Sequence, residues 1–178
     1  VAFWPLVESI QRDGVCAEVI APAPSSSGRE SQVAAEIAVA VAEGVDVTGV
    51  LAVELFETDD ERILINELAM RPHNSGHWSI EGSVTSQFEQ HLRAVLDLPL
   101  GATDTRAPWT VMVNVLGGPT DGDLARPRTR ALGEHPDVAV HLYGKAPRPG
   151  RKIGHVTALG ADLDDVASRA RAAAAAFD

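Results

Sequence analysis

Two apolar segments that each contain a glutamate, and the polar loop that follows them, hold the residues best suited to chemistry. Glu54 interrupts the apolar run 51–56, and Glu67 lies near the end of a second apolar segment. The loop after Glu67 contains an arginine, two histidines, an amide and a hydroxyl within residues 71–77. Loops this dense in hydrogen-bond donors and titratable groups commonly bind an anion or carry out proton chemistry.

The spacing of the two glutamates predicts that both lie on one face of an antiparallel strand pair. We expect strands at 47–57 and 62–68 around a turn at 58–61. An even turn pairs Glu54 with Ile65 and Ala52 with Glu67, whereas an odd-length loop would break this register. Glu54 and Glu67 are then diagonal neighbours, with Cβ atoms roughly 7 Å apart.

A divalent cation would remove the repulsion between these two carboxylates, which otherwise favours their protonation. Mg²⁺ binds one or two protein carboxylates and completes its octahedron with water and phosphate oxygens. The alternative is that Glu54 and Glu67 are ordinary strand residues that point to solvent. Their predicted neighbours on the same face, Phe56 and Ile65, are apolar and weigh against that alternative.

The polar loop contains an arginine suited to binding an anion and two histidines that could be considered as zinc ligands. The planar guanidinium of Arg71 can hold a carboxylate, bicarbonate or phosphate through two hydrogen bonds, although a surface salt bridge is the alternative. His73 and His77 have the spacing of two zinc ligands on a helix. Pro72 and Gly76 argue against a helix there, and no cysteine or third histidine lies nearby, so zinc is disfavoured.

Length and composition limit the classes of protein that this chain can represent. The 178 residues allow one ordinary domain or two small ones, and the hydrophobic content of 45% is sufficient for a core. The net charge of −10 argues against nucleic-acid or anionic-membrane binding, and no apolar run is long enough to span a bilayer. The single cysteine, Cys16, suits the cytoplasm and a buried position. Because the sequence starts without methionine and inside a predicted strand, we expect a piece of a longer protein.

The periodicity predicts an α+β fold in two parts, with domains at 1–100 and 101–178. In the first part Ser86 and Glu89 form a capping box for a helix whose core positions are Phe88, Leu92, Val95 and Leu96. A boundary at 101–108 leads to a small, mainly β domain with a terminal helix. The remaining expected elements are strands at 3–8, 14–20, 109–116, 138–143 and 153–159, and helices at 28–43 and 162–177.

Several motifs together resemble 5-(carboxyamino)imidazole ribonucleotide synthase, an ATP-grasp ligase of purine biosynthesis. The similarity extends to about Val156, and its most specific part is the His-Asn-Ser-Gly-His-Trp run. The motifs are Val53-Glu54-Leu55-Phe56, Asn66-Glu67-Leu68-Ala69, Arg71-Pro72-His73-Asn74-Ser75-Gly76-His77-Trp78, Ser86-Gln87-Phe88-Glu89-Gln90-His91, and Arg148-Pro149-Gly150-Arg151-Lys152-Ile153-Gly154-His155.

The resemblance implies the C-terminal half of an ATP-grasp domain, an antiparallel sheet with helices, followed by a small C-terminal domain. It implies that ATP, bicarbonate and aminoimidazole ribonucleotide give the carbamate, ADP and phosphate through carboxyphosphate. By this similarity Glu54 and Glu67 bind Mg²⁺, and Asn66 and Glu67 lie at the nucleotide. Arg71 would hold bicarbonate or carboxyphosphate. The acyl-transfer site would be lined by His73, Asn74 and Ser75.

The basic segment near the C-terminus has two interpretations. From composition alone, residues 145–152 form a solvated loop. The resemblance instead implies that this segment binds the 5′-phosphate of the ribonucleotide. The four cations are Lys145, Arg148, Arg151 and Lys152.

Three further expectations concern the whole protein. The resemblance implies that an N-terminal domain and the half-domain with the glycine loop, the ATP-binding lysine and the adenine hinge precede Val1. We expect a cytoplasmic homodimer without nucleic-acid or membrane partners. The alternatives are another ATP-grasp carboxylase or formyl transferase, or a C-terminal fragment that folds but cannot turn over.

Overall fold

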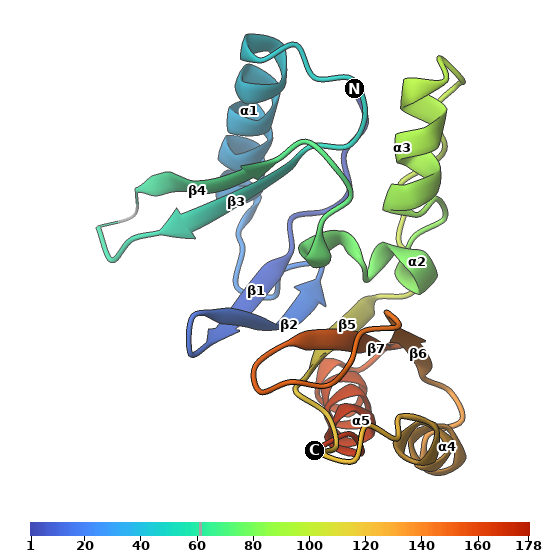
Figure 1. The fold of residues 1–178 in the computed structure, drawn as a ribbon. Coiled ribbons are helices and arrows are strands. Elements are labelled where there is room, and N and C mark those ends of the chain that lie inside the picture. Colours follow the sequence, from blue (N-terminus) through green and yellow to red (C-terminus); the bar gives the residue numbers. More distant parts are fainter. Residues whose placement is uncertain (61) are drawn as a thin grey trace. The chain divides into compact units, whose positions relative to one another are not determined.

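The computed structural model describes residues 1–60 and 62–178, which form two compact units (Figure 1). The first unit contains Val1–Leu6 and Ala23–Arg106, and the second contains Val7–Pro22 and Ala107–Asp178. The predicted turn at 58–61 includes Glu61, which lies outside the described residues. No helix in the described ranges is both long and apolar enough to cross a membrane.

The first unit combines a two-stranded antiparallel ribbon with helices. Its longest helix begins after Ser27, whose hydroxyl and backbone form a reciprocal capping box with Glu30. The ribbon is β3–β4, and a short 3₁₀ turn follows it. The elements in chain order are α1 (Gly28–Gly44), β3 (Ala52–Glu57), β4 (Ile63–Ala69), η1 (Asn74–Gly76), α2 (Ser79–Gly82) and α3 (Gln87–Val95).

The second unit is a five-stranded antiparallel sheet with two helices. The strand order is β1-β2-β5-β7-β6, and α5 packs against β5 and β7. Val111, Val156 and Val166 are fully buried where the helix meets the sheet. The alanines of α5 bring its backbone close to those strands. The elements are β1 (Glu8–Arg12), β2 (Val15–Ala21), β5 (Trp109–Leu116), α4 (Ala125–Glu134), β6 (Ala139–Leu142), β7 (Lys152–Gly160) and α5 (Leu163–Ala175).

The α+β class is confirmed, but several expectations about the elements are wrong. The strand expected at 47–57 begins only at Ala52. The first strand begins at Glu8 instead of residue 3. The β1–β2 hairpin joins the sheet of the second unit, because residues 18–21 pair with 110–113 of β5, so residues 7–22 belong to that unit. Helix α4 was not predicted, because its only buried residue is Ala131 and it therefore shows no apolar stripe.

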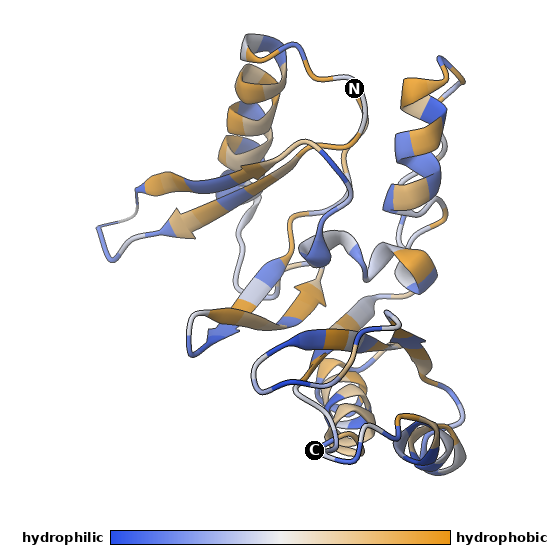
Figure 2. Ribbon diagram, viewed as in Figure 1, coloured by the Kyte–Doolittle hydropathy of each residue, from blue (hydrophilic) through white to orange (hydrophobic). Residues whose placement is uncertain are grey.

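The face of α3 that was predicted to be core is exposed. Phe88, Leu92, Val95 and Leu96 have 43–63% of their surface accessible, whereas Gln87 and Gln90 are buried. Figure 2 shows the resulting alternation of hydrophobic and hydrophilic segments along α3. Within the first unit, α3 is therefore held by its buried glutamine side chains and not by its aliphatic side chains. The Ser86 hydroxyl accepts the N–H of Glu89, which is one half of the predicted capping box. The Glu89 carboxylate accepts from Arg93.

Candidate functional site

The two glutamates face each other directly across the β3–β4 ribbon, and the predicted diagonal register is wrong. Glu54 pairs with Glu67 while Leu55 pairs with Ile65, so Asn66 is the extra residue of a bulge. At the turn Glu57 pairs with Ile63, and the Thr58 N–H donates to the Arg62 carbonyl at 3.0 Å. The connection 58–62 is thus odd in length, and together with the bulge it changes the pairing.

Direct opposition brings the carboxylates closer than the predicted register did, since opposite Cβ atoms lie about 4.5–5.5 Å apart. The amide Nδ2 of Asn66 donates to Glu54 Oε2 at 3.3 Å, so the bulge residue also turns toward this pair. Two opposed carboxylates are the hard oxygen donors that Mg²⁺ prefers, and their mutual repulsion falls when a cation lies between them. The residues present therefore fit Mg²⁺.

His73 lies between the two glutamates. Its Nδ1 is 3.8 Å from Glu54 Oε1, and its Nε2 is 3.9 Å from Glu67 Oε1. The backbone N–H of Ser75 donates to Nδ1 at 3.4 Å, and the Ser75 hydroxyl lies 2.9 Å from the same nitrogen. Because a backbone N–H can only donate, Nδ1 accepts, and the neutral ring carries its proton on Nε2. Nε2 is thus the proton-bearing nitrogen near Glu67.

The other predicted loop residues follow the same turn. Asn74 and Ser75 belong to η1, and His73 is its N-cap. Arg71 is exposed, and its Nη1 donates to the Pro72 carbonyl at 3.1 Å. The structure therefore brings Glu54, Asn66, Glu67 and His73 into one cluster. Arg71 lies at the start of the loop, and its guanidinium donates a hydrogen bond to the loop backbone at Pro72.

Sequence reasoning missed the residue that holds this loop in place. Gln87, 2% exposed at the start of α3, bonds to both backbone groups of His73 and to the ring of His77. The His77 ring also stacks on Phe88, with ring centroids 5.6 Å apart. The available signal was a polar residue directly after the N-cap Ser86, at a position that most helices expose.

Three of the four basic residues lie on the loop of the second unit that joins β6 to β7. Within it Arg148–Arg151 form a turn closed by the Arg151 N–H and the Arg148 carbonyl at 3.0 Å. Pro149 and Gly150 occupy its central positions, and Gly150 has a φ of +71°, as a type II turn requires. Proline and glycine thus fix the turn, as the sequence predicted. Lys152 begins β7.

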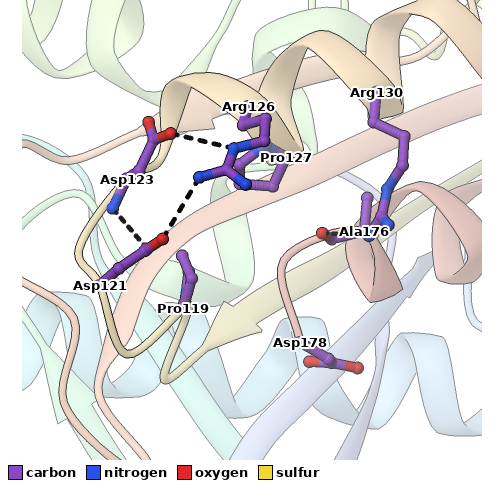
Figure 3. A pocket seen from close by; sticks show the side chains of 8 residues that line it. All are labelled: Pro119, Asp121, Asp123, Arg126, Pro127, Arg130, Ala176 and Asp178. Carbon is purple, nitrogen blue, oxygen red and sulfur yellow. Dashed lines mark hydrogen bonds and ion pairs between the residues drawn. The ribbon is translucent and has the colours of Figure 1, made fainter.

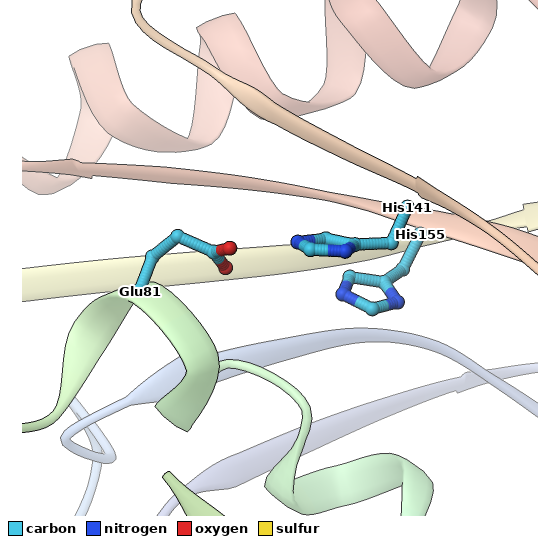
Figure 4. Close-up of side chains that lie close together, drawn as sticks. All are labelled: Glu81, His141 and His155. Carbon is cyan, nitrogen blue, oxygen red and sulfur yellow. The ribbon is translucent and has the colours of Figure 1, made fainter. Parts of the chain in front are cut away.

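A partly buried tyrosine lies at the start of this loop. The Tyr143 hydroxyl lies 2.7 Å from Nδ1 of His155, which is 1% exposed. Figure 4 shows the rings of His141 and His155 face to face, and their centroids are 4.6 Å apart. Lys145 Nζ lies 5.4 Å from the centre of the Tyr143 ring, on its face. Burial raises the pKa of the Tyr143 hydroxyl above its usual value, so it remains protonated.

A separate cavity of about 260 Å³ in the second unit contains none of the predicted site residues (Figure 3). Arg126 in its wall is paired with Asp121 and Asp123, and Arg130 donates to the Ala176 carbonyl. Both arginines of the cavity already bond to other residues of its wall. The glutamate cluster is therefore the better candidate for the functional site.

Two family models match separate parts of the chain. The ATP-grasp domain matches residues 1–88. The phosphoribosylaminoimidazole carboxylase C-terminal domain matches residues 110–169.

Relatives with known names agree with both models. The N5-carboxyaminoimidazole ribonucleotide synthase of Mycobacterium tuberculosis is 54% identical over 181 residues, which cover 97% of this chain and 41% of that protein. The corresponding synthase of Corynebacterium ammoniagenes is 55% identical, with 98% of this chain and 43% of the relative covered. The chain thus spans about two fifths of the length of the curated relatives that it matches.

Solved structures are similar over nearly the whole chain. The N5-carboxyaminoimidazole ribonucleotide synthetase of Thermus thermophilus has a TM-score of 0.82 and 43% identity, covering 94% of this chain and 44% of that one. The N5-carboxyaminoimidazole synthase of Aspergillus clavatus, solved with ADP and 5-aminoimidazole ribonucleotide, has a TM-score of 0.86 and 36% identity. It is covered to 46%, and this chain to 97%.

The paired glutamates, the histidine loop and the matching models define part of an ATP-grasp protein, followed by a carboxylase C-terminal domain. Within that class the chain belongs to the N5-carboxyaminoimidazole ribonucleotide synthase family.

Proposed function

We propose that this chain serves the ATP-dependent carboxylation of 5-aminoimidazole ribonucleotide by bicarbonate, within purine biosynthesis. The products are N5-carboxyaminoimidazole ribonucleotide, ADP and phosphate. The observation that carries the proposal is the direct opposition of Glu54 and Glu67 with His73 between them. Relatives that share this segment are named as synthases of that product, and one was solved with ADP and the ribonucleotide.

The first chemical step is phosphoryl transfer to bicarbonate. A bicarbonate oxygen attacks the γ-phosphorus of ATP, the bond to the β,γ-bridging oxygen breaks, and ADP leaves as carboxyphosphate forms. Mg²⁺ held by Glu54 and Glu67 would supply positive charge at the phosphate oxygens. The exposed guanidinium of Arg71 suits bidentate binding of bicarbonate and of the carboxyphosphate that follows.

The second step transfers the carboxyl group to the exocyclic amine. The amine nitrogen bonds to the carboxyl carbon, the carbon–oxygen bond to phosphate breaks, and the nitrogen loses a proton. We assign His73, Asn74 and Ser75 to this site. N–H and O–H donors held on a fixed turn stabilise negative charge on the transferring carboxyl group without reorganisation. The bonds between Ser75 and His73 Nδ1 provide that rigidity.

We assign the ribonucleotide phosphate to the loop between β6 and β7. The turn at 148–151 presents Arg148 and Arg151, and Lys145 precedes it on the same loop. Both arginines are exposed. Cations on a fixed turn form charge-assisted hydrogen bonds with phosphate at a reduced entropic cost. With Lys152 at the start of β7, four positive side chains lie within residues 145–152.

The remaining assignments follow from the same proposal. The protein would use ATP and Mg²⁺, act in the cytoplasm and form a homodimer. The proposed domain division at residue 100 is supported by the matching models, which end at 88 and begin at 110.

The test is Glu67→Gln in the full-length enzyme, with bicarbonate- and ribonucleotide-dependent ADP release as the assay. We expect the rate to fall by several orders of magnitude while the protein stays folded, because one of two opposed carboxylates is lost. Glu57→Gln is the matched control, since Glu57 is an exposed glutamate of the same ribbon. An unchanged rate for Glu67→Gln at saturating Mg²⁺ contradicts the metal-binding role.

A further inference from the structure

The side-chain amide of Gln87 is fully engaged by the histidine loop. Its Oε1 accepts the backbone N–H of His73 at 2.8 Å, and its Nε2 donates to the His73 carbonyl at 2.8 Å. The same Nε2 lies 2.8 Å from Nδ1 of His77. A buried amide with all of these bonds satisfied has a single low-energy orientation, since any rotation leaves buried donors without acceptors.

These bonds determine the protonation of His77. A backbone N–H only donates and a carbonyl only accepts, so the two bonds to His73 fix which end of the Gln87 amide is oxygen and which is nitrogen. The Nε2 hydrogens therefore point at His73 and at His77. Nδ1 of His77 must accept, and the neutral ring carries its proton on Nε2.

Two neighbouring residues show that the loop is built around this amide. A Cβ placed on Gly76 would lie 2.4 Å from Gln87 Oε1, so the backbone approaches the amide as closely as only glycine permits. The buried hydroxyl of Ser79 donates to the Gly76 carbonyl at 2.6 Å and accepts the backbone N–H of Gln87 at 2.9 Å. The loop and the start of α3 are thus joined at two adjacent points.

We propose that Gln87 is a positioning residue that sets the backbone of His73 and holds His77 as its Nε2–H tautomer. Its consequence for catalysis rests on the proposed carboxylation, because His73 is placed there at the acyl-transfer site. The tautomer of His77 does not depend on that function and can be measured separately.

The first experiment reads the tautomer by long-range ¹H–¹⁵N NMR of the imidazoles in the 178-residue chain at neutral pH. We expect an unprotonated Nδ1 on His77 in the unsubstituted protein, and a proton on Nδ1 there overturns the proposal without any variant. Gln87→Glu offers only acceptor oxygens, so we expect Nδ1 of His77 to become protonated. Gln87→Met removes the donor, and we expect a mixture of tautomers. An unchanged His77 in both variants also overturns the proposal.

Gln90→Glu is the matched control. Gln90 is similarly buried on the same helix, and its amide bonds to both backbone groups of Gly101 at 2.8 Å. The substitution removes a comparable pair of hydrogen bonds from α3 but changes no hydrogen bond to the histidines. We expect the His77 tautomer to be unchanged in Gln90→Glu. A changed tautomer would mean that general loosening of α3, and not the Gln87 amide, controls the loop.

The second experiment measures steady-state kinetics of Gln87→Met in the full-length enzyme. We expect kcat to fall about 100-fold with little change in KM for ribonucleotide, since a displacement of about 1 Å can cost this much. Equal kcat in Gln87→Met and the unsubstituted enzyme overturns the catalytic part. If the unsubstituted enzyme shows no carboxylation while His77 has the expected tautomer, the proposed function fails and the positioning role of Gln87 stands.

Discussion

At the scale of single residues, Arg71 and Arg151, two of the arginines assigned to anions, are held in similar ways. Arg71 Nη1 donates to the Pro72 carbonyl at 3.1 Å, and Arg151 Nη1 donates to the Ala146 carbonyl at 3.3 Å. Both side chains are exposed, so each guanidinium has one edge bound to its own loop and is accessible to an anion. They lie in different units, and we expect them to serve different substrates.

Substituting each arginine in the full-length enzyme separates these roles. Arg71→Lys should impair the use of bicarbonate, because an ammonium group cannot replace a bidentate guanidinium. Arg151→Ala should raise the KM for the ribonucleotide. The expected loss of binding free energy is ~1.5–3 kcal/mol, the contribution of a charge-assisted hydrogen bond. Kinetics with each substrate varied in turn provide the measurement, and Arg128→Ala, on the exposed face of α4, is the control. The same loss for the same substrate in both variants would refute the division of roles.

Residue types were enough to find the glutamates and the histidine loop, but not the contacts between them. Glu54, Glu67 and His73 stand out because carboxylates and imidazoles are unusual in or directly after apolar strands. Their direct opposition depends on a bulge at Asn66 and an odd connection at 58–62, which sequence spacing does not show. Gln87 was missed because a glutamine at the start of a helix normally faces solvent.

At the scale of elements, one ion pair ties the terminal helix to the central sheet. Glu18 on β2 is 1% exposed, and both of its oxygens accept from Arg171 on α5, at 2.7 and 2.8 Å. The hydrogen bonds to Glu18 raise the pKa of Arg171 further above its usual value, so the arginine stays charged. These two residues are far apart in sequence, and their pairing fixes the position of α5 within the second unit.

Removing the arginine should destabilise the second unit. Arg171→Ala leaves a buried carboxylate without its cation, and we expect a loss of about 3 kcal/mol in the free energy of unfolding. Urea denaturation followed by circular dichroism measures this loss. The double variant Glu18→Met with Arg171→Met replaces both charges by apolar groups, and we expect nearly unchanged stability. If Arg171→Ala is as stable as the unsubstituted chain, the pair does not hold the helix.

Elements with a continuous apolar pattern were predicted well, and those fixed by polar contacts were not. Strand β5 begins and ends where the sequence predicts, because residues 109–116 form one largely buried run. The apolar residues of α3 were assigned to a core since their spacing is helical, yet they are exposed. Periodicity identifies an amphipathic helix but does not state what its apolar face contacts.

At the scale of the whole molecule, the described residues divide into two units, the first of which ends at Arg106. The domain division at residue 100 stays a prediction. The hairpin in Val7–Pro22 is early in the sequence and belongs to the second unit. Long-range strand pairing of this kind is set by tertiary contacts, since residues 18–21 carry no local signal that their partner is β5.

The last prediction concerns nucleotide binding by the 178 residues alone. Relatives solved with ADP or ATP are covered only to 44–46% by this chain. Small-molecule sites bury most of their ligand, and the binding energy comes from enclosing the base and phosphates together. Here Glu67 lies on a two-stranded ribbon, and its side chain is 53% exposed.

We therefore expect a folded chain whose Kd for MgATP exceeds about 1 mM, equivalent to less than about 4 kcal/mol of binding free energy. Isothermal titration of the 178-residue chain with MgATP tests this, with the full-length enzyme as the control that binds. Micromolar affinity together with ADP release on addition of bicarbonate would show that these residues suffice for the nucleotide. The glutamate pair and histidine loop would then hold ATP without a second enclosing surface.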